Sequence, residues 1–177
     1  KFAWSMIAPW YSGRMPANEM TIARVLQQNG YTTGHSGKWH MAIDHKAFPQ
    51  PEDQGFDWTR SSRGARSSMK SRVTGFATNR KKDPFRLDKN GYPFHQTSED
   101  ALTFLRQNNA QPFFLYYATW LVHTPIHTRS EKLLEKYCKK LGVEKPKENK
   151  DWTLKGQQNP FYCAMVEELD YYIGKVI

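Results

Sequence analysis

The chain alternates between helical and strand patterns, and this alternation constrains its fold more than any other feature. Apolar residues recur at helical spacing over 20–26 and the pattern stops at Gly30. The β-favouring stretch 31–36 follows directly, which predicts a strand that ends near Gly37. Because strands joined through helices usually run parallel, this order favours a parallel sheet.

The same order returns downstream and contains the most apolar run of the sequence. Thr97 and Asp100 form a capping box that predicts the start of a second helix, and the unbroken aromatic and aliphatic run Phe113–Trp120 follows it. Such a run is typical of a strand that is buried on both faces. Extended to Val122 it has ten residues, well short of the roughly 18–20 that a membrane-spanning helix needs, so we expect no membrane segment.

Two further helices are predicted near the C-terminus. One lies between Ser130 and Gly142, and the other begins at Asn159 with Pro160 in its first turn. The full order is therefore helix, strand, long loop, helix, strand, helix, helix. Buried strands that alternate with helices predict an α/β fold with a mostly parallel sheet.

The net charge of +9 is concentrated in one segment. Residues 60–89 contain ten basic and two acidic side chains, and their lack of any apolar period predicts a long basic loop over 60–96. This composition fits a solvated loop without further function, and it also fits a surface for a sulfated or phosphorylated polymer. Nucleic acid is disfavoured, because no aromatic residue lies between Arg60 and Thr74 to stack on bases.

Residues that directly follow the predicted strands are candidates for a functional site, because ligands of parallel sheets bind beyond the carboxyl ends of the strands. Lys38 and His40 follow the first strand, while Trp120, His123 and His127 follow the second. If the two strands lie side by side, Lys38, His40 and His123 converge at one edge of the sheet. A fixed ammonium charge and two imidazoles, whose usual pKa is ~6.5, suit an anionic substrate and proton transfer at neutral pH.

Each of these residues also has a purely structural interpretation. A lysine after a strand is mostly exposed to solvent, and a histidine beside a tryptophan is often a packing residue. Trp120 could equally pack beneath the turn that follows its strand. His123 and His127 have the spacing of a zinc-binding helix, but Pro125 would break that helix, so no metal site is predicted.

Four ordered segments match the motifs of one enzyme family. The most specific is GYTTGHSGKWHM at 30–41, where a Gly-Tyr-x-Thr element runs into GKWH. The other three are DQGFD at 53–57, PFFLYYATWLVHTP at 112–125 and YCAMVEELDYYIGKV at 162–176. Together these segments resemble the type I sulfatases of the alkaline phosphatase superfamily. The resemblance implies hydrolysis of sulfate esters and an alkaline-phosphatase-like α/β/α sandwich, of which this chain would form a part.

The resemblance also implies roles for three of the strand-end residues. Lys38 would correspond to the lysine that binds the sulfate group and contacts the hydrated aldehyde of the nucleophile. His40 would correspond to the histidine that hydrogen-bonds this hydrate, and His123, in the HTP turn, to the histidine on a sulfate oxygen near the leaving group. Trp120 and His127 are then expected to shape the substrate pocket.

Sulfatases use a calcium ion and a formylglycine, which is made from the Cys or Ser of a C/S-x-P-x-R motif. No such motif occurs in the 177 residues, and the two cysteines, Cys138 and Cys163, lie in other contexts. The family's paired aspartates and its later Asp-Asn metal pair are missing too, so calcium ligands and nucleophile are expected outside this chain. We therefore interpret residues 1–177 as an internal part of one sulfatase catalytic domain, without its N-terminal nucleophile and metal segment and its C-terminal part. The isolated chain is expected to be inactive.

Two other functions share these features. A phosphonate or phosphodiester hydrolase of the same superfamily would have the same fold and a similar GKWH element. A non-catalytic sulfatase-like domain would bind sulfated glycans through the basic loop. We expect a sulfate ester as the substrate, with a sulfated polysaccharide as the polymer that suits the basic charge, and no nucleic acid partner. The resemblance also indicates a periplasmic, extracellular or lysosomal compartment.

Overall fold

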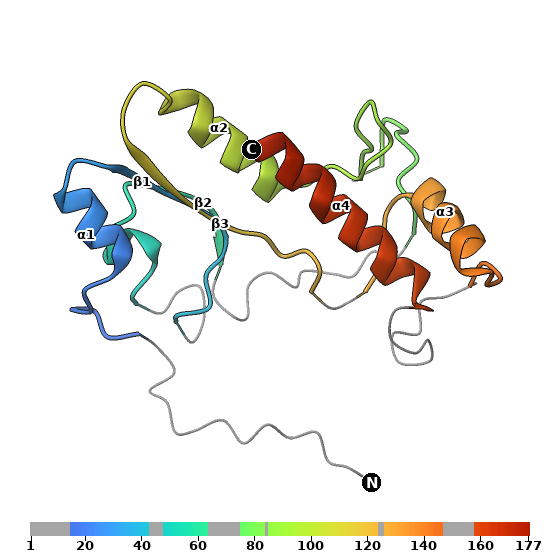
Figure 1. Ribbon diagram of the computed structural model, residues 1–177, viewed down its shortest axis with the longest axis horizontal. Helices are drawn as coiled ribbons and strands as arrows, with labels where there is room; N and C mark the ends of the chain where they lie inside the picture. The colour runs from blue at the N-terminus through green and yellow to red at the C-terminus, as the bar shows by residue number, and fades with distance from the viewer. Residues whose placement is uncertain (1–14, 43–47, 64–74, 84, 124–125, 147–157) are drawn as a thin grey trace, which may run out of the picture. The chain divides into compact units, whose positions relative to one another are not determined.

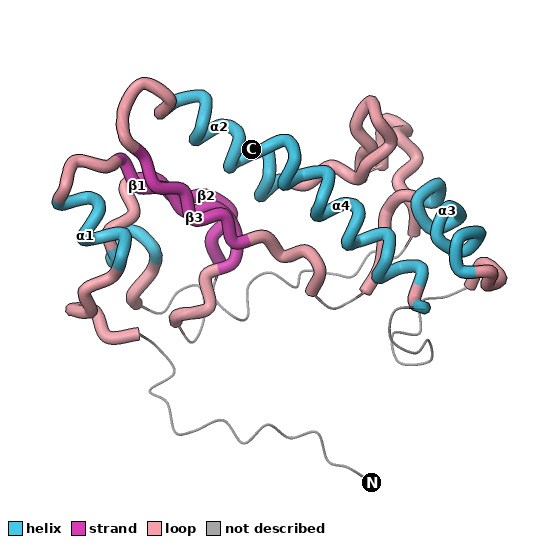
Figure 2. The backbone as a smooth tube through the Cα atoms, in the orientation of Figure 1, coloured by secondary structure: helices cyan, strands magenta, loops and turns pink. Residues whose placement is uncertain are grey.

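The structure, a computed structural model, describes residues 15–42, 48–63, 75–83, 85–123, 126–146 and 158–177. Figures 1 and 2 show its helices and strands along the chain. The chain divides into two compact units. Unit 1 falls within residues 1–70 and 104–118, and unit 2 within residues 71–103 and 119–177. Each unit has its own buried cluster of hydrophobic side chains.

Unit 1 is built on a three-stranded parallel sheet, whose strands are labelled in Figure 1. The order of the strands in the sheet is β2-β1-β3. The central strand β1 (Thr32–Lys38) pairs with β2 (Trp58–Arg63) on one side and with β3 (Phe113–Ala118) on the other. Gly37 pairs with Ala118, so β1 and β3 end at the same edge of the sheet. The predicted parallel sheet is confirmed, and its two predicted strands lie side by side.

One face of this sheet carries Thr33 and His35 of β1. The residues of β3 in register with them, Phe114 and Tyr116, lie on the same face. Helix α1 (Ile22–Gln28) covers this face, together with the short helix η1 (Pro51–Gln54) and the glycine that ends it. The buried cluster there consists of Ala23, Trp39 and Phe56, with Met15 and Phe114 packed against it.

The opposite face carries Gly34, which leaves room for an aromatic ring. Helix α2 (Gln96–Gln107) begins in unit 2 and ends in unit 1, where its fully buried Phe104 lies against Gly34. The Phe104 ring also contacts Trp58 and Phe113, at centroid distances of 5.4 and 6.0 Å. Helices thus cover both faces of the sheet, as expected for part of an α/β/α sandwich.

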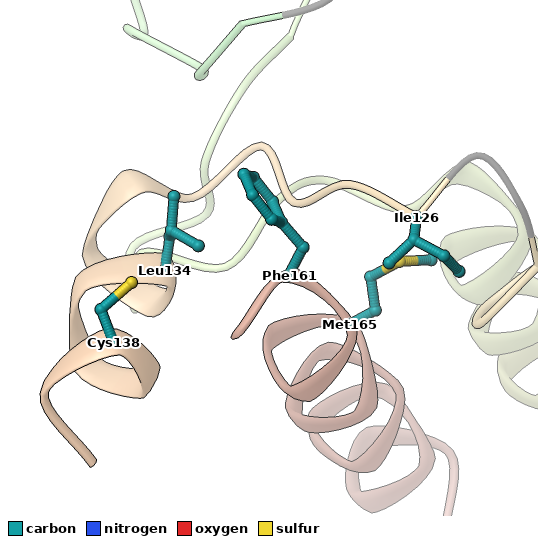
Figure 3. Close-up of a cluster of buried hydrophobic side chains, with 5 residues drawn as sticks. All are labelled: Ile126, Leu134, Cys138, Phe161 and Met165. Carbon is teal, nitrogen blue, oxygen red and sulfur yellow. The ribbon is translucent and has the colours of Figure 1, made fainter. Parts of the chain in front are cut away.

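Unit 2 is built on two helices, α3 (Glu131–Leu141) and α4 (Pro160–Val176). Helix α3 begins and ends as predicted, and α4 begins as predicted. Ser130 caps α3 by accepting a hydrogen bond from the Leu133 amide, and Asn159 caps α4. Gly142 ends α3 in the left-handed conformation that glycine tolerates best. Figure 3 shows the hydrophobic cluster of this unit, which consists of Ile126, Leu134, Cys138, Phe161 and Met165.

Strand β3 is not buried on both faces, so that prediction is wrong. None of its six residues is fully buried, whereas five of the seven residues of β1 are. Within the described part of the chain β3 is an edge strand with only β1 beside it, which leaves much of its apolar surface uncovered. The strand also ends at Ala118, two residues before Trp120.

The basic loop is shorter than predicted, because residues 60–63 belong to strand β2 and Gln96 to helix α2. The sequence of β2 is polar, but its backbone pairs with β1 and an edge strand tolerates polar side chains. Of the rest of the segment, residues 75–83 and 85–95 are turns and irregular structure with one antiparallel bridge, between Leu87 and Pro93. Arg66 and Arg72 lie outside the described residues.

Helix α2 begins one residue before Thr97, so the predicted capping box is displaced. The amides of Ser98 and Glu99 donate to the carbonyl of His95, which places His95 at the cap position. A nitrogen of the His95 ring, Nδ1, also lies 2.6 Å from the Ser98 hydroxyl. Among the described residues, no helix is both long and apolar enough to cross a bilayer.

Candidate active site at the strand ends

Lys38 is the last residue of the central strand, and the backbone is irregular just before it. The register with β2 shifts between Ser36 and Lys38, so that Lys38 pairs with Arg63. Gly37 has a φ of 112°, which strains any residue with a Cβ atom and suits glycine. The bulge leaves Lys38 half-buried at the carboxyl edge of the sheet.

The ring of His35 supports this irregular segment from inside the fold. Its Nε2 atom lies 3.3 Å from the Lys38 carbonyl oxygen, and because a carbonyl can only accept, Nε2 must carry the hydrogen. Burial lowers the pKa of His35 to about 4, and the bond to Lys38 only partly offsets this. The ring is therefore neutral at pH 7. Within the part of the chain that the structure describes, its buried Nδ1 atom has no hydrogen-bond partner.

Three aromatic rings surround the His35 imidazole and account for its low pKa. Trp39, Phe56 and Tyr116 lie at centroid distances of 5.4, 5.4 and 5.5 Å. Rings exclude water and offer little stabilisation to an imidazolium that they meet mostly edge-on, so protonation is disfavoured. His35 is thus a buried, neutral side chain that packs in the core of unit 1 and hydrogen-bonds the backbone of Lys38.

Acid should therefore destabilise the fold through His35. The native pKa of about 4 lies below the ordinary 6.5, so the unfolded chain binds the proton first and stability is lost as the pH falls from 6.5 towards 4. We expect His35 to account for about 2 kcal/mol of lost stability between pH 7 and pH 5. Urea unfolding of the complete protein and of its His35→Gln variant at both pH values measures this difference, since other groups titrate alike in both proteins. Equal losses in the two proteins would contradict it.

His40 lies two residues beyond the strand and is exposed. Its neighbour Trp39 is only 5% exposed, and the Trp39 indole N–H donates to the Pro49 carbonyl at 3.1 Å. The buried indole fixes the backbone on one side of His40 and leaves the imidazole at the surface of unit 1.

Trp120 and His123 lie in the turn that follows β3, in unit 2. The His123 amide donates to the Trp120 carbonyl at 2.8 Å, which closes the turn. The two rings meet edge to face, with centroids 5.9 Å apart and planes at 77°. Trp120 is half-buried and His123 is exposed, while Thr124 and Pro125 of the HTP turn lie outside the described residues.

His127 has the surroundings of a packing residue. Its ring is half-buried between Phe76 and Phe161, at centroid distances of 6.0 and 5.5 Å with nearly parallel planes. Nε2 lies 3.3 Å from the Gly75 carbonyl oxygen. These contacts favour the structural interpretation of His127 over a role in shaping the substrate pocket.

The prediction that Lys38, His40 and His123 converge requires that β1 and β3 end at the same edge of the sheet. The two strands do end at the same edge. Lys38 and His40 belong to unit 1, while Trp120, His123 and His127 belong to unit 2. Joint action of Lys38, His40 and His123 on one ligand therefore stays a prediction.

The predicted site residues do not fit calcium, because Ca²⁺ takes oxygen ligands and these residues offer an ammonium group and imidazoles. In the described ranges no three His, Cys, Asp or Glu side chains are grouped so that they could hold a metal ion. Cys138 and Cys163 are reduced thiols within α3 and α4, and burial raises the pKa of both, so neither has the character of a nucleophile. No step through calcium or formylglycine can be assigned to this chain.

Among the described residues, a buried histidine and a buried glutamate were not singled out from the sequence. His35 lies within GYTTGHSGKWHM, where its position two residues after buried Thr33 indicates an inward-facing side chain. Glu168 of α4 lies seven residues after buried Phe161, on the same helix face. It accepts a hydrogen bond from the Thr128 hydroxyl, and burial raises its pKa to about 7. The alternation of a strand could have indicated that His35 is buried, and the spacing of a helix could have indicated the same for Glu168.

A parallel sheet covered by helices on both faces, with a lysine where its central strand ends, defines an α/β protein with a candidate ligand site at the strand ends. Comparison with known proteins gives the family. The family model "Sulfatase" matches residues 4–177, and the chain belongs to the sulfatase family. The resemblance inferred from the four motifs is thereby confirmed.

Similar proteins with curated descriptions include several arylsulfatases. The chain is 29% identical over 143 residues to an arylsulfatase of Hemicentrotus pulcherrimus, an alignment that covers 70% of this chain and 25% of the relative. It is 30% identical over 148 residues to arylsulfatase G of Canis lupus familiaris, covering 64% and 27%. The chain thus spans about a quarter of the length of these relatives.

Two solved structures share the fold. One, from a study of the metabolism of multiple glycosaminoglycans by Bacteroides thetaiotaomicron, has a TM-score of 0.59 at 17% identity and matches 93% of this chain and 38% of its own. The other, Ps i-CgsB in complex with k-i-k-neocarrahexaose, has a TM-score of 0.51 at 20% identity, with coverages of 91% and 36%. At these identities the likeness concerns the fold alone.

Proposed function

We propose that the complete protein to which this chain belongs hydrolyses sulfate esters. The observation that carries the proposal is the position of Lys38 within a matched sulfatase segment, at the carboxyl end of the central parallel strand. A lysine at this edge supplies a fixed positive charge where parallel sheets bind their ligands.

The proposed roles of the chain's own residues follow from their chemistry. The Lys38 ammonium binds oxygens of the sulfate group and offsets charge that develops there in the transition state. The imidazole of His123 hydrogen-bonds a sulfate oxygen near the leaving group, from where its N–H can supply a proton to the departing oxygen as the S–O bond breaks. His40 is assigned a hydrogen bond to the attacking group, which is expected outside this chain.

We propose a sulfated polysaccharide as the substrate. The described part of the basic segment places five exposed cationic residues over ten positions, namely Arg80, Lys81, Lys82, Arg86 and Lys89. Such a concentration of charge attracts a polyanion more strongly than a small ester with one charge. One structural neighbour comes from a study of glycosaminoglycan metabolism, and the other is in complex with k-i-k-neocarrahexaose, which supports this choice of substrate class.

Turnover of paired model substrates tests the proposed activity. We expect the complete protein to hydrolyse an aryl sulfate at least tenfold faster, in kcat/KM, than the matching aryl phosphonate monoester, because a sulfatase site stabilises transfer of the sulfuryl group. The sulfate and phosphonate esters of one phenol have the same leaving group. The ratio of their rates therefore reports only whether the enzyme prefers transfer at sulfur or at phosphorus. Faster phosphonate hydrolysis would show a phosphonate hydrolase, and no turnover of either ester by protein carrying the nucleophile would show a non-catalytic domain.

A further inference from the structure

Unit 2 contains a cavity of about 470 Å³ that none of the proposed catalytic residues lines. Its size lies within the range of ~300–1,000 Å³ that is usual for small-ligand sites. Among the described residues, the wall combines aromatic and aliphatic side chains with two guanidinium groups and includes no acidic side chain; its members are Phe85, Arg86, Leu87, Pro93, Phe94 and Arg129.

Most of these residues belong to a short hairpin with a well-defined turn. The Phe94 amide donates to the Arg86 carbonyl at 2.8 Å, and Leu87 and Pro93 form an antiparallel bridge. Within the turn, the Asp88 carboxylate accepts hydrogen bonds from the amides of Asn90 and Tyr92, which is the usual way for an aspartate to fix a turn.

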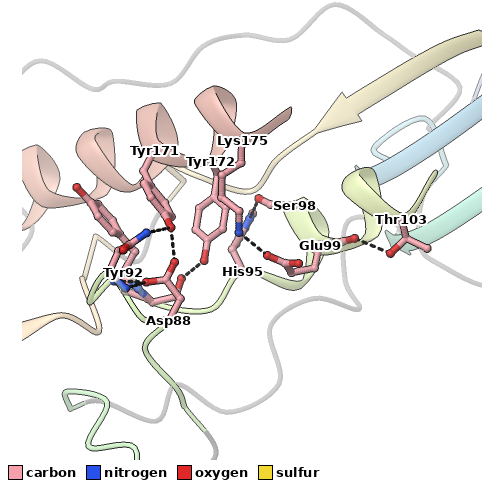
Figure 4. A network of polar contacts seen from close by, with 11 residues as sticks. Asp88, Tyr92, His95, Ser98, Glu99, Thr103, Tyr171, Tyr172 and Lys175 are labelled. Carbon is pink, nitrogen blue, oxygen red and sulfur yellow. Dashed lines mark hydrogen bonds and ion pairs between the residues drawn. The ribbon is translucent and has the colours of Figure 1, made fainter. Parts of the chain in front are cut away.

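Helix α4 anchors this hairpin, as Figure 4 shows. The rings of Tyr92 and Tyr171 stack with centroids 3.8 Å apart and planes at 3°. The Tyr171 hydroxyl donates to Asp88 at 2.5 Å, and the Tyr172 hydroxyl donates to the Pro93 carbonyl at 2.5 Å. The wall of the cavity is therefore preorganised, which lowers the entropy cost of binding a ligand there.

The two arginines give the cavity its chemistry. The Arg129 guanidinium lies 3.6 Å from the centroid of the Phe85 ring, and its Nη1 donates to the Gly75 carbonyl at 2.9 Å. Burial lowers the pKa of Arg129 and nearby Asp83 opposes this, but an arginine stays charged in either case. The Asp83 carboxylate itself accepts hydrogen bonds from Thr78 and Phe85. Arg86 also lines the cavity and is exposed to solvent.

We propose that this cavity binds a sulfated sugar unit of a polysaccharide. The planar guanidinium groups of Arg86 and Arg129 present paired N–H donors to the oxygens of a sulfate group. The Phe94 ring, 52% exposed, offers a flat apolar surface for the C–H face of the sugar. That the sulfate group is carried by a sugar is an inference that rests on the proposed function. That the ligand combines an oxyanion with an apolar surface follows from the residues of the cavity wall.

Binding of a heparin hexasaccharide to the complete protein, measured by calorimetry at 150 mM salt, tests this site without requiring hydrolysis. Arg86→Ala and Phe94→Ala should each raise the Kd about tenfold, since each removes one charge-assisted or one stacking contact. Lys89→Ala is the matched control: Lys89 is an exposed cation of the same hairpin outside the cavity wall, so its loss removes only a small part of the general attraction to a polyanion and should change the Kd less than twofold. Polyglutamate, an acidic chain without sugar rings, should not compete with the hexasaccharide.

The same variants separate this proposal from the proposed function. Arg86→Ala and Phe94→Ala should leave turnover of a small aryl sulfate unchanged, since that substrate is too small to need the cavity. Equal effects of Arg86→Ala and Lys89→Ala on the Kd, no binding of the hexasaccharide by unchanged protein, or full competition by polyglutamate would each overturn the cavity as a sugar site. If the unchanged protein does not hydrolyse the aryl sulfate at all, that result would instead count against the sulfatase activity.

Discussion

Replacement of Lys38 by alanine in the complete protein should lower kcat/KM for an aryl sulfate by about 10²–10³-fold, which is the usual cost of losing one electrostatic donor to a transition state. Lys38 stands at the end of the central strand, where the bulge at Gly37 and the His35 ring hold its backbone. The loss should fall mainly on kcat, because the ammonium is expected to bind the charge that develops as the S–O bond breaks more strongly than it binds the ground state.

Two conservative variants separate charge from shape in this prediction. Lys38→Met keeps the length of the side chain without its charge and should be as slow as Lys38→Ala. Lys38→Arg keeps the charge in another geometry and should recover part of the rate. Unfolding midpoints of all three variants should stay near that of the unchanged protein, since Lys38 is only half-buried. Near-normal turnover by Lys38→Met would contradict a catalytic role for the ammonium.

Truncation of Phe104 to alanine should destabilise the fold by about 3–5 kcal/mol, because it leaves a large cavity beside the sheet. This ring is fully buried and meets Gly34, Trp58 and Phe113. Phe113→Ala is a suitable comparison, since that ring is 40% exposed and its loss should cost much less. Chemical unfolding of the complete protein and of the two variants measures the difference, and equal costs would contradict the packing described.

Gly34 provides a second variant on the same contact. A Cβ atom on Gly34 would lie 2.5 Å from the Phe104 ring, so Gly34→Ala should cost about 1–3 kcal/mol through overpacking. In the Phe104→Ala background the added methyl group enters the vacated space, and the cost should shrink or change sign. Additive costs in the double variant would show that the two residues are not in contact.

Local signals predicted the helix ends well where one residue alone determines them. Ser130 and Gly142 at the ends of α3, and Asn159 at the start of α4, act through side-chain oxygens or backbone conformation that need no tertiary partner. The start of α2 was misplaced because its cap is His95, which lacks the usual preference for that position.

Tertiary contacts explain the parts of the fold that the sequence did not predict. Strand β2 has a polar sequence, and its conformation follows from pairing with β1 rather than from an apolar pattern. For the site, strand ends correctly indicated where Lys38 lies, since parallel strands share an edge. They did not distinguish His127, which packs between Phe76 and Phe161, or reveal that the His35 ring is buried against Phe56 and Tyr116, because these aromatic neighbours are distant in sequence.

The most direct test of the account is a double-mutant cycle on aryl sulfate turnover by the complete protein, with Lys38→Ala, His123→Ala and the combined variant. If both side chains act on the same sulfate group, the second substitution should cost much less in the absence of the first, with a coupling of about 1–3 kcal/mol in kcat/KM. Losses that simply add, or an His123→Ala variant as active as the unchanged protein, would contradict a shared anionic site at the strand ends.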